Sequence, residues 1–221
     1  IPVDSDPNVS DPPELPVWIH QSVAPRPPSP ATMAPSDLGG AKALAGEMAD
    51  GTDEATSLRR GRLIHLALEH LPDVPQAQRR DTGAALLRQS QDEPDDAEIA
   101  GFLAHAMAAL DCPDMAEAFS ADALAEVGIT AHLDDLGGRR IHGTIDRLVV
   151  GDDRILAIDY KSNRVIPARP EDVPEGVLRQ MGAYAAALAQ IYPGRRIETA
   201  ILWTGGPTLM PLPHDIVRGA L

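Results

Sequence analysis

The chain has 221 residues and a formal net charge of −14 at pH 7, from 19 basic and 33 acidic side chains, and it has one cysteine. This length allows one domain with a buried core. The single cysteine excludes an internal disulfide and a four-cysteine zinc or iron–sulfur site. Two Trp, three Tyr and two Phe are too few for a row of base-stacking platforms. No apolar run approaches the roughly 20 residues of a membrane span, so we expect a soluble protein of a reducing compartment, the cytoplasm.

The charge is unevenly distributed along the chain. Residues 1–136 carry 8 basic and 24 acidic side chains, whereas residues 137–221 carry 11 basic and 9 acidic ones. We therefore expect any polyanion site in the second part. Among the basic residues 17 are arginine, and the two lysines are Lys42 and Lys161. A lysine retained against this background suggests a position that needs a lysine.

The N-terminal segment is rich in proline. Ten of the 21 prolines fall in residues 1–35, a density that disfavours helix and favours an extended arm or linker. Trp18 is the expected anchor of this arm on a neighbouring domain. The sequence begins at Ile1 rather than Met, so we expect a piece of a longer protein. The globular domain is predicted over residues 36–221, with a helix start at Ser36.

Hydrophobic periodicity predicts a helical part followed by a sheet. Apolar residues at spacings of three and four predict helices at 58–71, 75–90 and 95–110. The period then becomes two, which predicts strands at 123–133, 139–150 and 153–160 in an antiparallel meander. A helix at 175–192 precedes a strand at 197–204. Since a strand after a long helix implies a crossover, the sheet should be mixed.

Two predicted strands bring acidic residues together. Alternation in strand 139–150 places Asp146 on one face, with Ile145 and Val149 on the other. Asp159 and Lys161 share a face at the end of the next strand, so Asp146 and Asp159 should lie side by side. Two close carboxylates repel unless a cation lies between them, which favours a hard divalent metal ion. The alternative interpretation is that each aspartate merely ends a strand near a turn.

Four sequence blocks together resemble a known family. They are residues 60–69 (RGRLIHLALE), 143–148 (GTIDRL), 157–163 (AIDYKSN) and 180–184 (QMGAY). In this order they resemble the PD-(D/E)xK nucleases of the RecB type. The resemblance implies an α/β fold: a restriction-endonuclease-like core with a central mixed sheet, a helical N-terminal half and a Pro-rich N-terminal arm. Without it, His65 on its helix would be an ordinary core or surface histidine.

The resemblance also implies roles for individual residues. Mg²⁺ or Mn²⁺ would be bound by His65, Asp146, Asp159 and the backbone carbonyl of Tyr160. Lys161 would orient the attacking water or stabilise charge on the phosphate. Gln180 and Tyr184, four apart on one helix face separate from the buried stripe, would position Lys161 and the DNA strand. Glu126 matches a further acidic position near such sites.

The Pro-rich approach to the domain resembles, more narrowly, that of bacterial helicase-nucleases of the AddA type. This implies an exonuclease that cuts a DNA strand delivered by a helicase during double-strand-break repair and recombination, with an AddB-like protein as its partner. No Gly-x-x-x-x-Gly-Lys-[Ser/Thr] motif occurs, so ATP would be used only by a helicase part outside these residues. Two alternatives stay open: a free-standing RecB-like exonuclease, and a catalytically inactive nuclease fold that docks partners or guides DNA.

Overall fold

The computed structural model describes residues 15–20, 22, 31–44, 47 and 53–221. The chain divides into two units, Ile1–Pro30 and Ala31–Leu221. In the first unit a 3-10 turn spans Val17–His20, and Trp18 on it is 69% exposed. Much of the predicted arm at 1–35 lies outside the described residues, so the arm, its anchor and the boundary at residue 36 stay predictions.

Three helices follow the start of the second unit. They are α1 (Glu54–His70), α2 (Arg79–Arg88) and α3 (Asp96–Leu110), which confirms the helices predicted from periodicity. The helix start predicted at Ser36 is wrong, because Pro35–Asp37 forms one 3-10 turn. Gly39 and Gly40 follow with φ of 84° and 89°, a left-handed conformation that ends any helix. The first long helix begins instead after Asp53, whose side chain accepts a hydrogen bond from the backbone N–H of Thr56.

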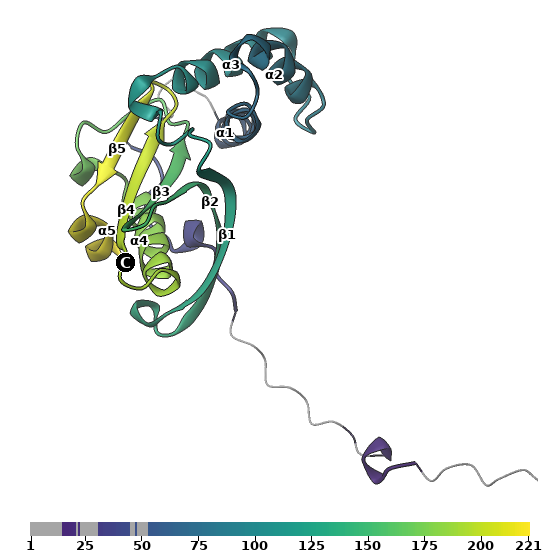
Figure 1. Ribbon diagram of the computed structural model, residues 1–221, viewed down its shortest axis with the longest axis vertical. Helices are drawn as coiled ribbons and strands as arrows, with labels where there is room; N and C mark the ends of the chain where they lie inside the picture. The colour runs from purple at the N-terminus through teal and green to yellow at the C-terminus, as the bar shows by residue number, and fades with distance from the viewer. Residues whose placement is uncertain (1–14, 21, 23–30, 45–46, 48–52) are drawn as a thin grey trace, which may run out of the picture. The chain divides into compact units, whose positions relative to one another are not determined.

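A five-stranded mixed sheet forms the centre of this unit (Figure 1). In spatial and chain order its strands are β1 (Ala123–Leu133), β2 (Arg139–Val150), β3 (Arg154–Lys161), β4 (Arg196–Trp203) and β5 (Thr208–Leu212). Neighbours are antiparallel except β3 and β4, which are parallel and joined through α4 (Glu175–Ile191). The predicted meander and crossover are thereby confirmed.

The sequence patterns did not predict β5 or the short helix α5 (His214–Ala220). β5 contains Pro211, which cannot donate a ladder hydrogen bond and is tolerated there because β5 is an edge strand. None of the helices in the described part of the chain is long and apolar enough to cross a bilayer.

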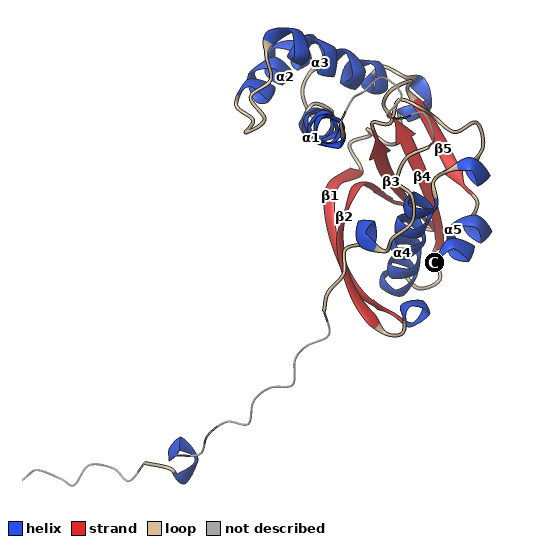
Figure 2. Cartoon of the chain, turned by 180° about the vertical axis from the view of Figure 1, so that it is seen from behind, coloured by secondary structure: helices blue, strands red, loops and turns tan. Residues whose placement is uncertain are grey.

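Each face of the sheet has its own buried core. One core joins the sheet to α4 and α5 through residues such as Ile145, Met181 and Val217. The other joins the opposite face to α1 and α3 through Leu63, Leu103 and Ile158 among others. Figures 1 and 2, from opposite sides, show α1 to α3 grouped apart from α4 and α5. The sheet is therefore covered on both faces, and side chains of α1 and α4 reach β3 from opposite sides.

The alternation of side chains along β2 breaks at Asp146. Ile145 and Leu148, three residues apart, belong to the same core, whereas Val149 packs in the core of the other face. The predicted grouping of Val149 with Ile145 is therefore wrong. Glu126 lies opposite Asp146, between the pairs Ala125↔Arg147 and Val127↔Ile145 of the register, and it has a φ of 49°. A non-glycine residue in this region is strained.

Candidate active site

A cleft of about 820 Å³ opens beside α1, next to Asp146 within β2 and to the end of β3. The segment around Ser36 and Lys42 and the residues after β3 complete its lining. Of the residues predicted from sequence, those that line it are His65, Glu126, Asp146, Tyr160, Lys161 and Gln180. Asp159 and Tyr184 lie just behind this surface, 3% exposed each, and are hydrogen-bonded to Gln180. The structure thus brings together residues from two helices and three strands.

Asp146 lies where β2 separates from β3. The ladder between these strands begins at Arg147↔Ile158, and beyond it the Asp146 side chain takes the place of a backbone partner. Its Oδ2 accepts a hydrogen bond of 2.5 Å from the backbone N–H of Tyr160, and its Oδ1 lies 3.3 Å from Nδ1 of His65. Asp146 therefore ties α1 to the end of β3 while only 9% exposed.

Glu126 completes a group of three possible ligands. One ligand atom each from His65, Glu126 and Asp146 lie within 4.8 Å of one another. One nitrogen and two carboxylate oxygens at this spacing suit a divalent cation. The predicted set had Asp159 as a ligand and gave Glu126 a lesser place, whereas the structure places Glu126 in this group and pairs Asp159 with Lys161. Glu126 lies directly opposite Asp146 in the register of β1 and β2, so the two side chains project from the same face of the sheet.

Asp159, Lys161, Gln180 and Tyr184 form one hydrogen-bonded chain. Nζ of Lys161 lies 2.5 Å from Oδ2 of Asp159 and donates to Oε1 of Gln180 at 3.2 Å. Nε2 of Gln180 donates to Oδ1 of Asp159 at 2.6 Å and to the hydroxyl of Tyr184 at 3.1 Å. The Tyr184 hydroxyl donates in turn to the Thr144 carbonyl at 2.6 Å. The Lys161 ammonium is thereby held by two acceptors at the edge of the cleft.

Gln180 and Tyr184 share a face of α4, as expected, but that face is not separate from the buried stripe. Gln180 is 9% exposed and Tyr184 is 3% exposed. A Cβ built at Gly143 would lie 2.6 Å from Cδ of Pro35 and 3.4 Å from Cε1 of Tyr184. The segment at Pro35 thus covers this face, and a glycine at 143 permits the close approach. The spacing of apolar residues in α4 does not predict that a segment distant in the sequence covers this face.

The electrostatics of the cleft favour a bound cation. Burial lowers the pKa of His65, but the hydrogen bond and charge of Asp146 and the charge of Asp159 outweigh it and raise this pKa overall. Burial and the carboxylates of Asp146 and Glu69 raise the pKa of Glu126. Burial likewise raises the pKa of Asp159, with Asp146 adding to the rise and Lys161 opposing it. These carboxylates are destabilised by one another, and positive charge among them relieves the repulsion.

A buried arginine supports this site, and the sequence analysis missed it. Arg147 is 2% exposed; its Nε donates to the Tyr160 hydroxyl at 3.0 Å and its Nη2 to the Leu68 carbonyl at 2.9 Å. Its guanidinium lies 5.5 Å from the Phe119 ring centroid. The Tyr160 ring meets His65 edge-on at 5.3 Å. Arg147 thus fixes the end of α1 and the Tyr160 ring that packs on His65. Its place beside Asp146 in the GTIDRL block is the signal that could have found it.

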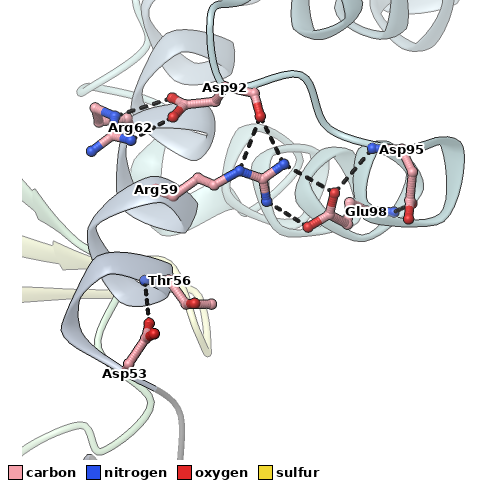
Figure 3. A network of polar contacts seen from close by, with 7 residues as sticks. All are labelled: Asp53, Thr56, Arg59, Arg62, Asp92, Asp95 and Glu98. Atoms are coloured by element: carbon pink, nitrogen blue, oxygen red, sulfur yellow. Dashed lines mark hydrogen bonds and ion pairs between the residues drawn. The ribbon is translucent and has the colours of Figure 1, made fainter.

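An ion-pair network fixes the first turns of the same helix (Figure 3). Arg59 donates to the backbone carbonyl of Asp92 at 3.0 and 2.8 Å and to the Glu98 carboxylate. Arg62 pairs with the Asp92 side chain. Glu98 also closes a capping box with Asp95 at the start of α3. α1 is therefore held to α3 near its start and by Arg147 near its end, which sets the position of His65 between them.

The chain is similar in part to known proteins. A 55-residue segment is 44% identical to the A subunit of an ATP-dependent helicase/nuclease of Lactiplantibacillus plantarum (strain ATCC BAA-793 / NCIMB 8826 / WCFS1). That segment is 25% of this chain and 4% of the relative, so the chain spans a small part of that protein. A solved structure described as "Crystal structure of SSO0001" aligns over 75% of this chain and 83% of the other, with 14% identity and a TM-score of 0.34, too low to carry an argument.

The family is settled by a match over most of the chain. The sequence model of the PD-(D/E)XK nuclease superfamily matches residues 41–209, which include the three strands and two helices that build the cleft. This match confirms the resemblance found in the four sequence blocks and agrees with the mixed sheet. The chain belongs to the PD-(D/E)XK nuclease superfamily.

Proposed function

We propose that this chain is a divalent-metal-dependent deoxyribonuclease of the exonuclease type, the nuclease domain of an AddAB-like helicase-nuclease. The observation that carries the proposal is the juxtaposition, in one cleft, of a three-residue ligand group with a lysine held by Asp159 and Gln180. Membership in a nuclease superfamily supports the reaction class. The similarity of a short segment to part of a helicase/nuclease supports the biological setting.

The donor set fits a hard divalent ion such as Mg²⁺ or Mn²⁺. His65 and Asp146 belong to both possible ligand sets, and either Glu126 or Asp159 with the Tyr160 carbonyl would complete them. When bound, such an ion lowers the pKa of a water and holds a phosphate oxygen. The pKa values of Glu126 and Asp159 are raised first by burial and further by the charge of Asp146, so a bound cation would stabilise their ionised forms.

Lys161 is proposed to orient the attacking water or to stabilise the charge that builds on the phosphate. Its Nζ is preorganised by Asp159 and Gln180, and its side chain is 22% exposed toward the cleft. Preorganised donors in a site of restricted solvent access stabilise developing charge without reorganisation. Tyr184 acts one step further back, because it fixes Gln180 and through it the ammonium.

Delivery of the strand by a helicase is consistent with the charge of the chain. A net charge of −14 opposes binding of a polyanion, so intrinsic DNA affinity should be low. A motor or an AddB-like partner that feeds a single strand raises its effective concentration at the cleft. A free-standing exonuclease would need that affinity from its own surface, which is why the helicase-linked function is preferred.

A cleavage assay on the purified chain tests the proposal. We expect end-labelled single-stranded DNA to be shortened with Mg²⁺ or Mn²⁺ and to stay intact with EDTA. Asp146→Asn should abolish cutting, while the matched control Asp152→Asn, at an exposed residue outside the cleft, should cut like the parent chain. Circular single-stranded DNA should resist an exonuclease.

Two results would contradict the proposal. Cleavage that persists with EDTA, or in the Asp146→Asn variant, would contradict a metal-dependent mechanism. A chain that binds Mn²⁺ at the cleft yet cuts no DNA would support the inactive, DNA-guiding alternative instead.

A further inference from the structure

A second cleft, of about 480 Å³, adjoins the first along α1. Its lining is made by Thr56, Ser57, Arg60, His105, Arg164 and Gly205. Ser57 and Arg60 also line the cleft that holds the ligand group, so the two clefts share a wall. An extended polymer bound in the first cleft can therefore continue into the second cleft along this side of α1.

Arg60 is the unusual residue of this shared wall. It is half-buried, and burial lowers the pKa of its guanidinium while the charge of Glu47 opposes that change. Its neighbours Arg59 and Arg62 on α1 are both engaged by Asp92, but Arg60 makes no hydrogen bond or ion pair within the part of the chain that the structure describes. Burying a cation with five donors and no acceptor is unfavourable. A ligand with several anionic oxygens would satisfy it.

The surroundings of Arg60 favour an anion over a cation. The charge of Glu47 acts on Arg60, but its two oxygens accept backbone N–H groups of Arg164 and Val165 at 2.8 and 3.0 Å. The six lining residues include no carboxylate, and Thr56 and Ser57 carry hydroxyls that can donate. A Cβ built at Gly205 would lie 2.9 Å from the Asn163 carbonyl, so a larger residue there would not fit.

We propose that this second cleft binds one phosphodiester group of the DNA strand, with Arg60 as its main ligand. The inference rests on the proposed function, since it concerns the strand whose next phosphates lie at His65 and Asp146. Arg60 and His65 are five residues apart, which separates them by about 7.5 Å along the axis of α1. Because both residues line the first cleft, a strand that lies in this cleft and continues into the second contacts both.

This assignment has a consequence for specificity. A guanidinium that binds phosphate positions the strand without reading its bases. This contact therefore adds affinity for single strands without adding a preference for their sequence.

The test measures binding of labelled single-stranded DNA in EDTA, where no cleavage occurs, over a series of salt concentrations. Arg60→Gln should lower the affinity on the order of tenfold, as expected for one charged hydrogen-bonded contact. It should also make the negative slope of log affinity against log salt concentration shallower by about 0.7. Arg80→Gln, at an exposed arginine of α2 outside both clefts, makes the same change in net charge and should alter neither quantity appreciably.

Two further measurements separate the possible failures. The melting temperature and Mn²⁺ affinity of Arg60→Gln should match those of the parent chain. If that variant does not fold, Arg60→Lys is tested in its place, since it keeps the charge but loses the planar fork of the guanidinium. It should lose less than tenfold in affinity for single-stranded DNA. Equal affinity and slope for Arg60→Gln and Arg80→Gln overturn the phosphate site even where the parent chain cuts DNA and Asp146→Asn does not. A loss confined to Arg60→Gln supports the phosphate site even where the parent chain cuts nothing.

Discussion

Removing the Asp146 carboxylate has two opposite effects on the folded protein. Oδ2 accepts the backbone N–H of Tyr160, a residue that is 2% exposed. Asp146→Ala leaves that buried N–H without an acceptor, at about 1 to 3 kcal/mol. The same change relieves repulsion with Glu126 and Asp159, whose pKa values are raised partly by Asp146. Since this relief is partly screened at an exposed Glu126, we expect the lost hydrogen bond to dominate.

Asp146→Asn separates the two effects. Asparagine keeps an oxygen for the Tyr160 N–H, removes the charge, and presents an amide N–H toward Nδ1 of His65, which accepts it when neutral. We expect Asp146→Asn to stay within about 1 kcal/mol of the parent chain. For a chain of this size 1 kcal/mol shifts the melting temperature by about 2 to 4 °C. Asp146→Ala should therefore unfold several degrees below Asp146→Asn.

Thermal unfolding followed by circular dichroism, at neutral pH with EDTA, measures this difference. Both variants should also lose Mn²⁺ binding, because each lacks the central ligand. Equal melting temperatures for Asp146→Ala and Asp146→Asn would refute the reasoning, since they would mean that the Tyr160 N–H does not depend on this carboxylate.

Three further variants test other parts of the site. Lys161→Arg should fold normally, keep Mn²⁺ binding and lose on the order of 100-fold in cleavage rate, because the wider guanidinium displaces the charge by about 1 Å; near-parental turnover at saturating Mg²⁺ removes Lys161 from the catalytic residues. Glu126→Gly should leave the melting temperature equal or higher in EDTA, since glycine accepts the φ of 49°, and should weaken Mn²⁺ binding by calorimetry; unchanged Mn²⁺ affinity excludes Glu126 as a ligand. Arg147→Met should lower stability by about 2 to 3 kcal/mol in urea unfolding, because the buried Tyr160 hydroxyl and the Leu68 carbonyl lose their donor; parental stability contradicts its supporting role.

Periodicity was sufficient to predict the elements that carry the site. β1 and β2 have the predicted bounds, because alternation is regular along β1 and along β2 up to Asp146, and their turn contains Gly137 and Gly138. β5 could not be predicted, since it has five residues, includes a proline and is defined by pairing with β4. The helix start at Ser36 failed for a related reason: capping residue types were present, but two glycines with positive φ follow them.

The site shows the same division between local and long-range information. Asp159 and Lys161 share a face in any strand, so their pairing follows from the period of two. Glu126 lies opposite Asp146 in the hairpin of β1 and β2, so its nearness to Asp146 follows from the predicted strand pairing. The burial of Tyr184 depends instead on a segment that packs from more than a hundred residues earlier, which leaves no periodic signal in the sequence.

The central claim is that a divalent ion binds in the cleft between α1, Asp146 of β2 and the end of β3. Anomalous scattering from a crystal of the chain soaked in Mn²⁺ tests it most directly. We predict a peak at bonding distance from both His65 and Asp146, with Glu126 or Asp159 as a further ligand. A saturating soak that gives no peak there, or a peak only elsewhere on the molecule, would contradict the account.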